Sequence, residues 1–347
     1  MNKNRVGYTF IVMASVVIVL AGIKSASTLL VPFLLSLFIA IILSPSYNYF
    51  KSKGLHEVLS LLLVISIFMV FIGLVVKLIG NSVNEFTTNI DMYSQKLTNY
   101  YLSIASFSEK YGIVIPIAEF STLLDSKRIM IFGTSVLQSM GSMFTDGFVI
   151  MLTVIFMLLE SSHFVNKINL ADGKRDTISH IKEISKKIKH YMVLKALMSL
   201  ITGFIIWISL VYIGTDYAFL WGVMAFLFNF IPNIGSIIAA VPAVIITLVQ
   251  LGSVSALFVT ILYVTVNTVV GSIIEPKIMG KGLGLSTLVV FLSLLFWGWL
   301  LGIIGMLLSI PLTIMAKIAF DANSNTKWIA VLLGTGENIE TNENVQK

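Results

Sequence analysis

The feature that most constrains this chain is the spacing of its charged residues. Asp, Glu, Lys and Arg make up 12% of the sequence, yet long windows contain none of them. A helix of about 20 apolar residues is long enough to span a bilayer. We therefore predict an all-α integral membrane protein, a polytopic helical bundle with about six full spans. These are Val6–Ile23, Leu29–Phe50, Val58–Val76, Gly147–Leu159, Ala196–Ile213 and Val254–Ile274.

Two further uncharged runs, Tyr217–Leu251 and Gly282–Ala316, are each about 35 residues long, which is too long for one straight crossing. Both are interrupted by glycine and proline. A helix that breaks at membrane depth frees backbone polar groups, which is tolerated only beside protein or a water-lined cavity. We predict that both runs are broken, re-entrant segments that enter and leave on one side, giving about eight membrane segments in all. Two long proline-kinked helices are the alternative.

The basic residues set the orientation. Lys3 and Arg5 precede the first span, Lys51 and Lys53 follow the second, and residues 165–195 carry eight basic against three acidic residues. These regions are cytoplasmic by the positive-inside rule. The segment 81–145 has four basic and five acidic residues and is placed outside. If both broken runs are re-entrant, Lys277 and Lys281 are cytoplasmic as well.

This topology divides the chain into six parts. They are N-terminal membrane helices (1–80), an extracytoplasmic helical insert (81–145), a membrane helix (146–164), a cytoplasmic basic amphipathic helix (165–193), a transport core with the broken segments (194–320) and a cytoplasmic tail (321–347). The amphipathic helix is expected to lie against anionic lipid on the inner leaflet.

The two broken runs also share an order of features: an aromatic cluster, then a glycine, then a proline. Paired interruptions of this kind are the best sequence indication of a transporter's binding site. The predicted substrate path comprises Asn229, Pro232, Asn233, Gly235, Ser236, Asn267, Trp297, Trp299, Gly302 and Gly305. Amides and hydroxyls suit a small, neutral, polar molecule, and the two tryptophans could stack on a ring or gate the path.

Charged residues near the ends of the spans offer a second interpretation. Glu160 and Glu275 are candidates for ion coupling, with Lys195, Lys277 or Lys281 as partners. Structural ion pairing at the membrane interface is the simpler alternative. A cation antiporter would be expected to carry carboxylates deep in the membrane, and the predicted spans have none in their middles.

Several other classes are excluded on spacing. The glycines around Lys281 do not match a phosphate-binding loop, and the four histidines form no H-E-x-x-H pair. The chain has no cysteine, so it has no thiolate metal site. We therefore predict no enzymatic activity, no cofactor and no metal site. We also predict no nucleic-acid partner, because the net charge of +6 follows from membrane topology.

Three stretches carry a resemblance to a known family: "VPFLLSLFIAIILSP", "FNFIPNIGS" and "IIEPKIMGKGLGLSTLVVFLSLLFWGWLLGIIGMLLSIPLT". Together with the rest of the chain from Ile23 to about Leu333, they resemble the autoinducer-2 exporter family of bacterial membrane transporters. The resemblance implies efflux of a small signalling molecule, autoinducer-2, across the inner membrane by a homo-oligomer, a pentamer. Some relatives are described as sodium/proton antiporters, which is the alternative function; a non-transporting receptor or scaffold is another.

Overall fold

A computed structural model describes residues 3–111, 147–160, 175–232, 234–279, 284–321 and 325–334. Every regular element in these ranges is helical, which confirms the all-α prediction at this level. The N-terminal helices are α1 (Lys3–Ser25), α2 (Ser27–Ser52), α3 (Glu57–Thr88), α4 (Ile90–Glu109) and Gly147–Glu160. The C-terminal helices are α7 (Arg175–Ile213), α8 (Ala218–Phe228), α9 (Gly235–Leu251), α10 (Ser253–Val266), the π-helix η1 (Asn267–Ile274), α11 (Glu275–Met279), α12 (Thr287–Leu307), α13 (Ser309–Asp321) and α14 (Lys327–Leu332).

Five of the described helices are long and apolar enough to cross a membrane: Ser27–Ser52, Glu57–Thr88, Lys186–Ile213, Ser253–Ile278 and Thr287–Leu307. Four shorter apolar helices accompany them: Phe10–Ser25, Gly147–Glu160, Ala218–Phe228 and Gly235–Leu251. The protein is therefore a multi-pass membrane protein. The predicted first and fourth spans fall among the shorter helices, so the expected number of eight segments stays a prediction.

Two helices run through boundaries that we expected from the sequence. Helix α3 continues past residue 80 to Thr88, so the start of the insert extends the third span. Residues 175–193 of the predicted amphipathic helix form the first part of α7, which runs without interruption from Arg175 to Ile213, and residues 165–174 lie outside the described residues. The sequence from 175 to 202 contains neither glycine nor proline, so nothing in it favours a helix end near residue 193.

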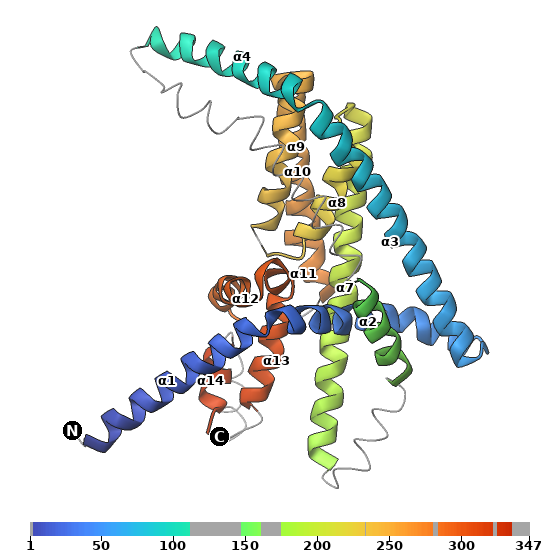
Figure 1. Cartoon of the computed structure of the whole chain (residues 1–347), viewed down its shortest axis with the longest axis vertical. Helices are drawn as coiled ribbons and strands as arrows, with labels where there is room; N and C mark the ends of the chain where they lie inside the picture. The colour runs from blue at the N-terminus through green and yellow to red at the C-terminus, as the bar shows by residue number, and fades with distance from the viewer. Residues whose placement is uncertain are drawn as a thin grey trace.

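The buried residues form three apolar clusters, each between a different set of helices. One joins α7, α8, α9 and α10, a second joins α2, α7, α12 and α13, and a third joins α2, α3 and the helix Gly147–Glu160. Figure 1 shows α9 and α10 side by side next to α8 and α7, while α1 extends away from the other helices. Because α7 contributes to two of the clusters, it connects the two halves of the described fold.

Small residues bring α7 and α8 into close contact. A Cβ atom built on Gly203 would lie 2.7 Å from the carbonyl oxygen of Gly222, and one on Gly222 would lie 2.5 Å from Cβ of Trp207. Membrane helices use such residues because close backbone approach replaces the hydrophobic driving force that lipid cannot supply. This contact fixes α8, and with it the start of the first broken run, against α7.

Candidate transport site

The first broken run folds back on itself, so that its two ends meet. The side-chain oxygen of Gln250 accepts a 2.7 Å hydrogen bond from the Asp216 backbone N–H, and its amide donates to the Gly214 carbonyl and the Asp216 carboxylate. The hydroxyls of Thr215 and Thr247 lie 3.1 Å apart. Helices α8 and α9 therefore form a helical hairpin whose base is the Asp216–Gln250 contact. We refer to it as the first hairpin.

The tip of the first hairpin is the interruption between α8 and α9. The Ile231 N–H donates to the Phe228 carbonyl, and the chain then turns past Pro232 into α9. A Cβ on Gly235 would lie only 1.8 Å from the Phe228 oxygen. This contact requires glycine for the turn itself, so Gly235 has a structural role, and its place on the substrate path stays a prediction. Asn233 lies outside the described residues.

The second broken run also contains a glycine that packs directly against a backbone carbonyl. Gly302 has φ 68° and ψ −151°, so α12 is sharply bent there, and a Cβ on Gly305 would lie 2.0 Å from the Trp297 oxygen. The two ends of this run also meet, because Lys317 donates a hydrogen bond to the Gly284 carbonyl. The order aromatic, glycine, proline that the two runs share in sequence thus corresponds to a shared close approach in space.

A small cavity of about 10 Å³ lies at the tip of the first hairpin. Its polar lining comes from three separate parts of the chain: Thr202 on α7, Asn229 and Ser236 beside the interruption, and Tyr263 and Asn267 on α10 and η1. The rest of the lining is apolar: Ile206, Ala225, Ala239 and Val266. Within the described residues the lining contains no charged side chain, so the cavity suits an uncharged polar ligand.

Two of the lining side chains have unsatisfied hydroxyls. Thr202 is 8% exposed and Tyr263 is 5% exposed, and neither hydroxyl has a hydrogen-bond partner among the described residues. Buried polar atoms are nearly always paired, so an unpaired one needs an explanation. By contrast, the Asn229 amide donates a 2.9 Å hydrogen bond to the Ser199 hydroxyl, which ties the tip to α7.

The backbone changes its winding beside the cavity. The π-helix η1 begins at Asn267 and continues to Ile274. π-Helical turns are rare and occur frequently at functional sites. The wider turns change the direction in which the side chains after Asn267 project. Glu275, which follows η1, faces α7.

The structure brings together only some of the predicted path residues. Asn229, Ser236 and Asn267 line the cavity, and Pro232 and Gly235 form the adjoining turn. Trp297, Trp299, Gly302 and Gly305 belong instead to the second broken run. The Trp297 indole donates to Thr313 within that run, and Trp299 is 55% exposed with the Lys24 ammonium 4.4 Å from its ring centre.

Sequence reasoning missed Thr202 and Tyr263. A threonine or tyrosine within an apolar span resembles an ordinary membrane residue, and only the burial of its hydroxyl without a partner distinguishes it. Spacing offered one weak indication, because Tyr263 lies four residues before Asn267 and therefore on the same helix face.

A buried ion pair lies near the cavity. It joins α7, which lines the cavity, to α11, which continues η1. The Lys195 ammonium on α7 donates to the Glu275 carboxylate at 2.7 Å, and the two side chains are 7% and 13% exposed. Both residues fall within the candidate spans Lys186–Ile213 and Ser253–Ile278. Of the three partners considered for Glu275, Lys195 is the one that it contacts within the described residues. Glu160 ends a different helix, in an exposed position.

A polar cluster surrounds the base of the first hairpin. The Tyr93 hydroxyl of α4 donates a 2.6 Å hydrogen bond to the Asp216 carboxylate, and the Asn89 amide donates to the Tyr217 hydroxyl. Burial, with the hydrogen bond to Asp216, raises the pKa of Tyr93 above its usual range. Tyr93 therefore remains a neutral donor, and the insert is joined to the end of α7 opposite the Lys195–Glu275 pair.

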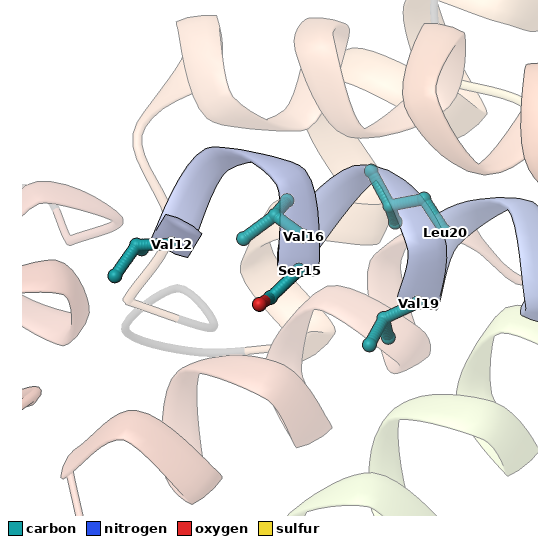
Figure 2. Close-up of a pocket in the computed structure, with 5 residues that line it drawn as sticks. All are labelled: Val12, Ser15, Val16, Val19 and Leu20. Carbon is teal, nitrogen blue, oxygen red and sulfur yellow. The ribbon is translucent and has the colours of Figure 1, made fainter. Parts of the chain in front are cut away.

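A larger hollow of about 300 Å³ lies on α1 and differs in character. It is lined by Val12, Ser15, Val16, Val19 and Leu20, all from one helix, as Figure 2 shows. The Ser15 hydroxyl already donates to the Ile11 carbonyl. This surface offers apolar contact and no free polar group among its lining residues, so the smaller cavity is the candidate functional site.

Comparison with known proteins shows the family of this chain. Residues 13–325 match the model of the AI-2E family transporters. The chain belongs to this family. It is 38% identical to the AI-2 transport protein TqsA of Escherichia coli over 93% of this chain and 94% of that protein. It is 39% identical to a putative transport protein of Haemophilus influenzae over 98% and 99% of the two chains, and 35% identical to the putative transport protein YhhT of E. coli over 93% of each.

Membership in this family makes the protein a membrane transporter and not an enzyme. The two interrupted runs are therefore parts of a transporter. In transporters, paired broken helices are expected to form the binding site. Within the described residues, the cavity between α7, the tip of the first hairpin and η1 is our candidate for this binding site.

Proposed function

We propose that this AI-2E family transporter exports a small, uncharged, hydroxyl-bearing signalling molecule, autoinducer-2, across the bacterial inner membrane by alternating access. The observation that carries this proposal is the pair of buried, unpartnered hydroxyls of Thr202 and Tyr263 beside the tip of the first hairpin. A ligand with several hydroxyl and carbonyl groups would satisfy both. The similarity to a protein named as an AI-2 transport protein supports the same cargo.

The size of the cavity supports alternating access over a preformed channel. A volume of about 10 Å³ accommodates about one water molecule. A ring-sized cargo therefore enters only if the first hairpin moves relative to α7 and η1. The Asn229–Ser199 hydrogen bond is a contact that such a movement would break.

The cavity also lies between two polar contacts that can close it. Along α7, Thr202 lies roughly 10 Å from Lys195 and roughly 18 Å from Gly214, at 1.5 Å per helical residue. The Lys195–Glu275 pair closes the side that we assign to the cytoplasm, and the Asp216–Gln250 contact closes the outer side. In this proposal the first hairpin is re-entrant from outside, and the second run from inside.

Transport by purified protein in liposomes tests the proposal. Liposomes loaded with autoinducer-2 should lose it faster with the protein than without it. Equal loss from protein-free liposomes would overturn the assignment of cargo, and would leave a receptor or scaffold role to be considered.

The antiporter alternative is favoured by one observation, the buried carboxylate of Glu275 within a candidate span. It predicts that a sodium gradient alone changes the internal pH of the same liposomes. Sodium-driven proton movement in the absence of autoinducer-2 would establish that alternative. No change in internal pH, together with autoinducer-2 flux, would support the exporter.

The homo-oligomer implied by the family resemblance, a pentamer in contact with membrane lipids, is part of this proposal. Native mass spectrometry of the detergent-solubilised protein measures the number of chains directly. A monomer that transports at the full rate would overturn this part and leave the cargo assignment intact.

A further inference from the structure

We infer that Glu275 is a proton-binding site, and that its ion pair with Lys195 couples proton binding to the opening of the cavity toward the cytoplasm. The inference rests on the proposed transport function, because it concerns how the same cavity opens. It starts from the Lys195–Glu275 pair, which holds the two helices that line the cavity together on its cytoplasmic side.

The ion pair and the cavity share two helix faces. On α7, Lys195, Ser199 and Thr202 are spaced by four and three residues and so lie on one face. Ser199 is fully buried and accepts the hydrogen bond from Asn229 at the hairpin tip. On the continuous helix made of α10, η1 and α11, Tyr263 and Asn267 line the cavity, and η1 leads from Asn267 to Glu275. A break of the ion pair therefore acts on the helices that hold the tip.

The surroundings of Glu275 suit a proton better than a metal cation. Among the described residues, Lys195 is its hydrogen-bond partner, and hard metal cations require several oxygen ligands at once. A proton requires only one carboxylate oxygen. Ionisable residues within membrane spans are costly and commonly mark proton or ion pathways.

The other titratable groups near the pair come from each element packed around it. Tyr191, one turn before Lys195 on α7, interacts electrostatically with Glu275. Lys189 of α7 donates to Ser44 of α2, Lys317 of α13 donates to the Gly284 carbonyl, and Lys277 of α11 is exposed. Asp321 of α13 interacts electrostatically with Lys317. Within the described residues, Lys195 is the direct counter-charge of Glu275.

The proposed cycle moves one proton inward. When the cavity is open to the outside, a proton from water on that side binds the Glu275 carboxylate and gives a neutral carboxylic acid. Lys195 keeps its charge and loses its counter-charge, and a buried, uncompensated ammonium is strongly disfavoured. The state in which Lys195 reaches water is therefore favoured, and in that state α7 and α11 have separated and the cavity is open to the cytoplasm. The carboxylic acid then releases its proton to cytoplasmic water, which restores the pair and closes the cavity behind the cargo, so one proton enters for each molecule exported.

Infrared difference spectroscopy tests proton binding without any cargo. The change from mildly alkaline to mildly acidic buffer should produce a carboxylic-acid band in the wild type that is missing in Glu275→Gln. Glu109→Gln, which alters an exposed carboxylate at the end of α4, is the matched control and should keep the band. Identical difference spectra for the wild type and Glu275→Gln would overturn the proton site, whatever the cargo proves to be.

Flux measurements test the coupling. For one proton exchanged per molecule, the steady-state ratio of the autoinducer-2 concentrations on the two sides of the membrane should change by about tenfold for each unit of imposed pH difference in the wild type. The double variant Lys195→Met, Glu275→Gln leaves no buried charge and keeps the side-chain volumes, so it should fold. We expect it to retain downhill flux and to lose the response to the gradient. A double variant that keeps the wild-type response would overturn the coupling.

The two proposals fail in distinguishable ways. Absence of autoinducer-2 flux in the wild type, with the Glu275 band present, would contradict the proposed cargo and support the proton site. Flux in the wild type with no Glu275 band would contradict the proton site and support the cargo.

Discussion

The backbone N–H of Asp216 donates a 2.7 Å hydrogen bond to the side chain of Gln250, 34 residues further along the chain. If residues 217–251 formed one straight helix, these groups would be roughly 50 Å apart at 1.5 Å per residue. Their contact means that the run returns to the end of α7 from which it started. The interruption at Pro232 is thus the tip of a hairpin and not a kink in a long span.

A disulfide across the base of this hairpin tests the return directly. The hydroxyls of Thr215 and Thr247 lie 3.1 Å apart, which is within reach of a disulfide when both residues are cysteine. We expect Thr215→Cys, Thr247→Cys to form an intramolecular disulfide on mild oxidation, detected by mass spectrometry of the digested protein. Since the natural chain has no cysteine, each single variant is a clean control. A double variant whose thiols remain free would contradict the hairpin.

The glycine at the tip gives a second prediction. Gly235→Ala places a Cβ 1.8 Å from the Phe228 carbonyl oxygen, and backbone atoms cannot move aside as a side chain can. We expect a loss of stability of about 1–3 kcal/mol or more, measured as a lower unfolding temperature in detergent. Gly73→Ala in α3 is the matched control, because nothing lies within 4 Å of its Cβ. Equal unfolding temperatures for the two variants would show that the tip is not packed as described.

Much of the fold could be predicted from the sequence, and the reason is physical. Uncharged windows have few other uses than membrane spans, so the starts of α2, α3 and α10 and the end of α7 lie within two residues of the predicted bounds. The end of α3 and the start of α7 could not be predicted, because in both places a polar extension continues the helix. Asn229 and Ser236 were predicted because polar side chains beside an interruption stand out in an apolar run, and Asn267 because it is an amide within an apolar helix; all three line the cavity. The helices that face these residues are set by the way the first hairpin folds back, which the sequence does not show. Thr202 and Tyr263 were therefore missed.

The unpartnered hydroxyls lead to a third prediction, which separates binding from folding. Tyr263→Phe and Thr202→Val each remove a hydroxyl that has no partner among the described residues, so the unfolding temperature should stay the same or rise. If the cargo bonds these groups, each loss costs about 1 kcal/mol of binding, which is about a fivefold rise in the half-saturating autoinducer-2 concentration. Flux in liposomes at several concentrations measures this.

The control for this pair is a hydroxyl that the fold already uses. Thr313 accepts from the Trp297 indole and donates to the Ser309 carbonyl, so Thr313→Val should lower stability by about 1–3 kcal/mol. Its half-saturating concentration should not change. Should Tyr263→Phe and Thr202→Val behave like Thr313→Val, the cavity hydroxyls would be structural and the site assignment would be wrong.

The last prediction concerns the side of the membrane on which the chain lies between α11 and α12. The first hairpin returns to the end of α7 near Gly214, and α10, η1 and α11 then carry the chain back to the level of Lys195, where Glu275 pairs with it. Residues 165–195 are predicted to be cytoplasmic from their basic charge, so the segment that follows α11 should be cytoplasmic too. That segment includes Lys281, which lies outside the described residues. A single Lys281→Cys substitution in this cysteine-free chain should react with an impermeant maleimide only after the membrane is opened. Tyr111→Cys, at an exposed position just after α4 within the insert, should react in intact cells and shows that the reagent reaches the outer face. Reaction of Lys281→Cys in intact cells would place this segment outside and contradict the re-entrant topology, whereas protection until the membrane is opened would support it.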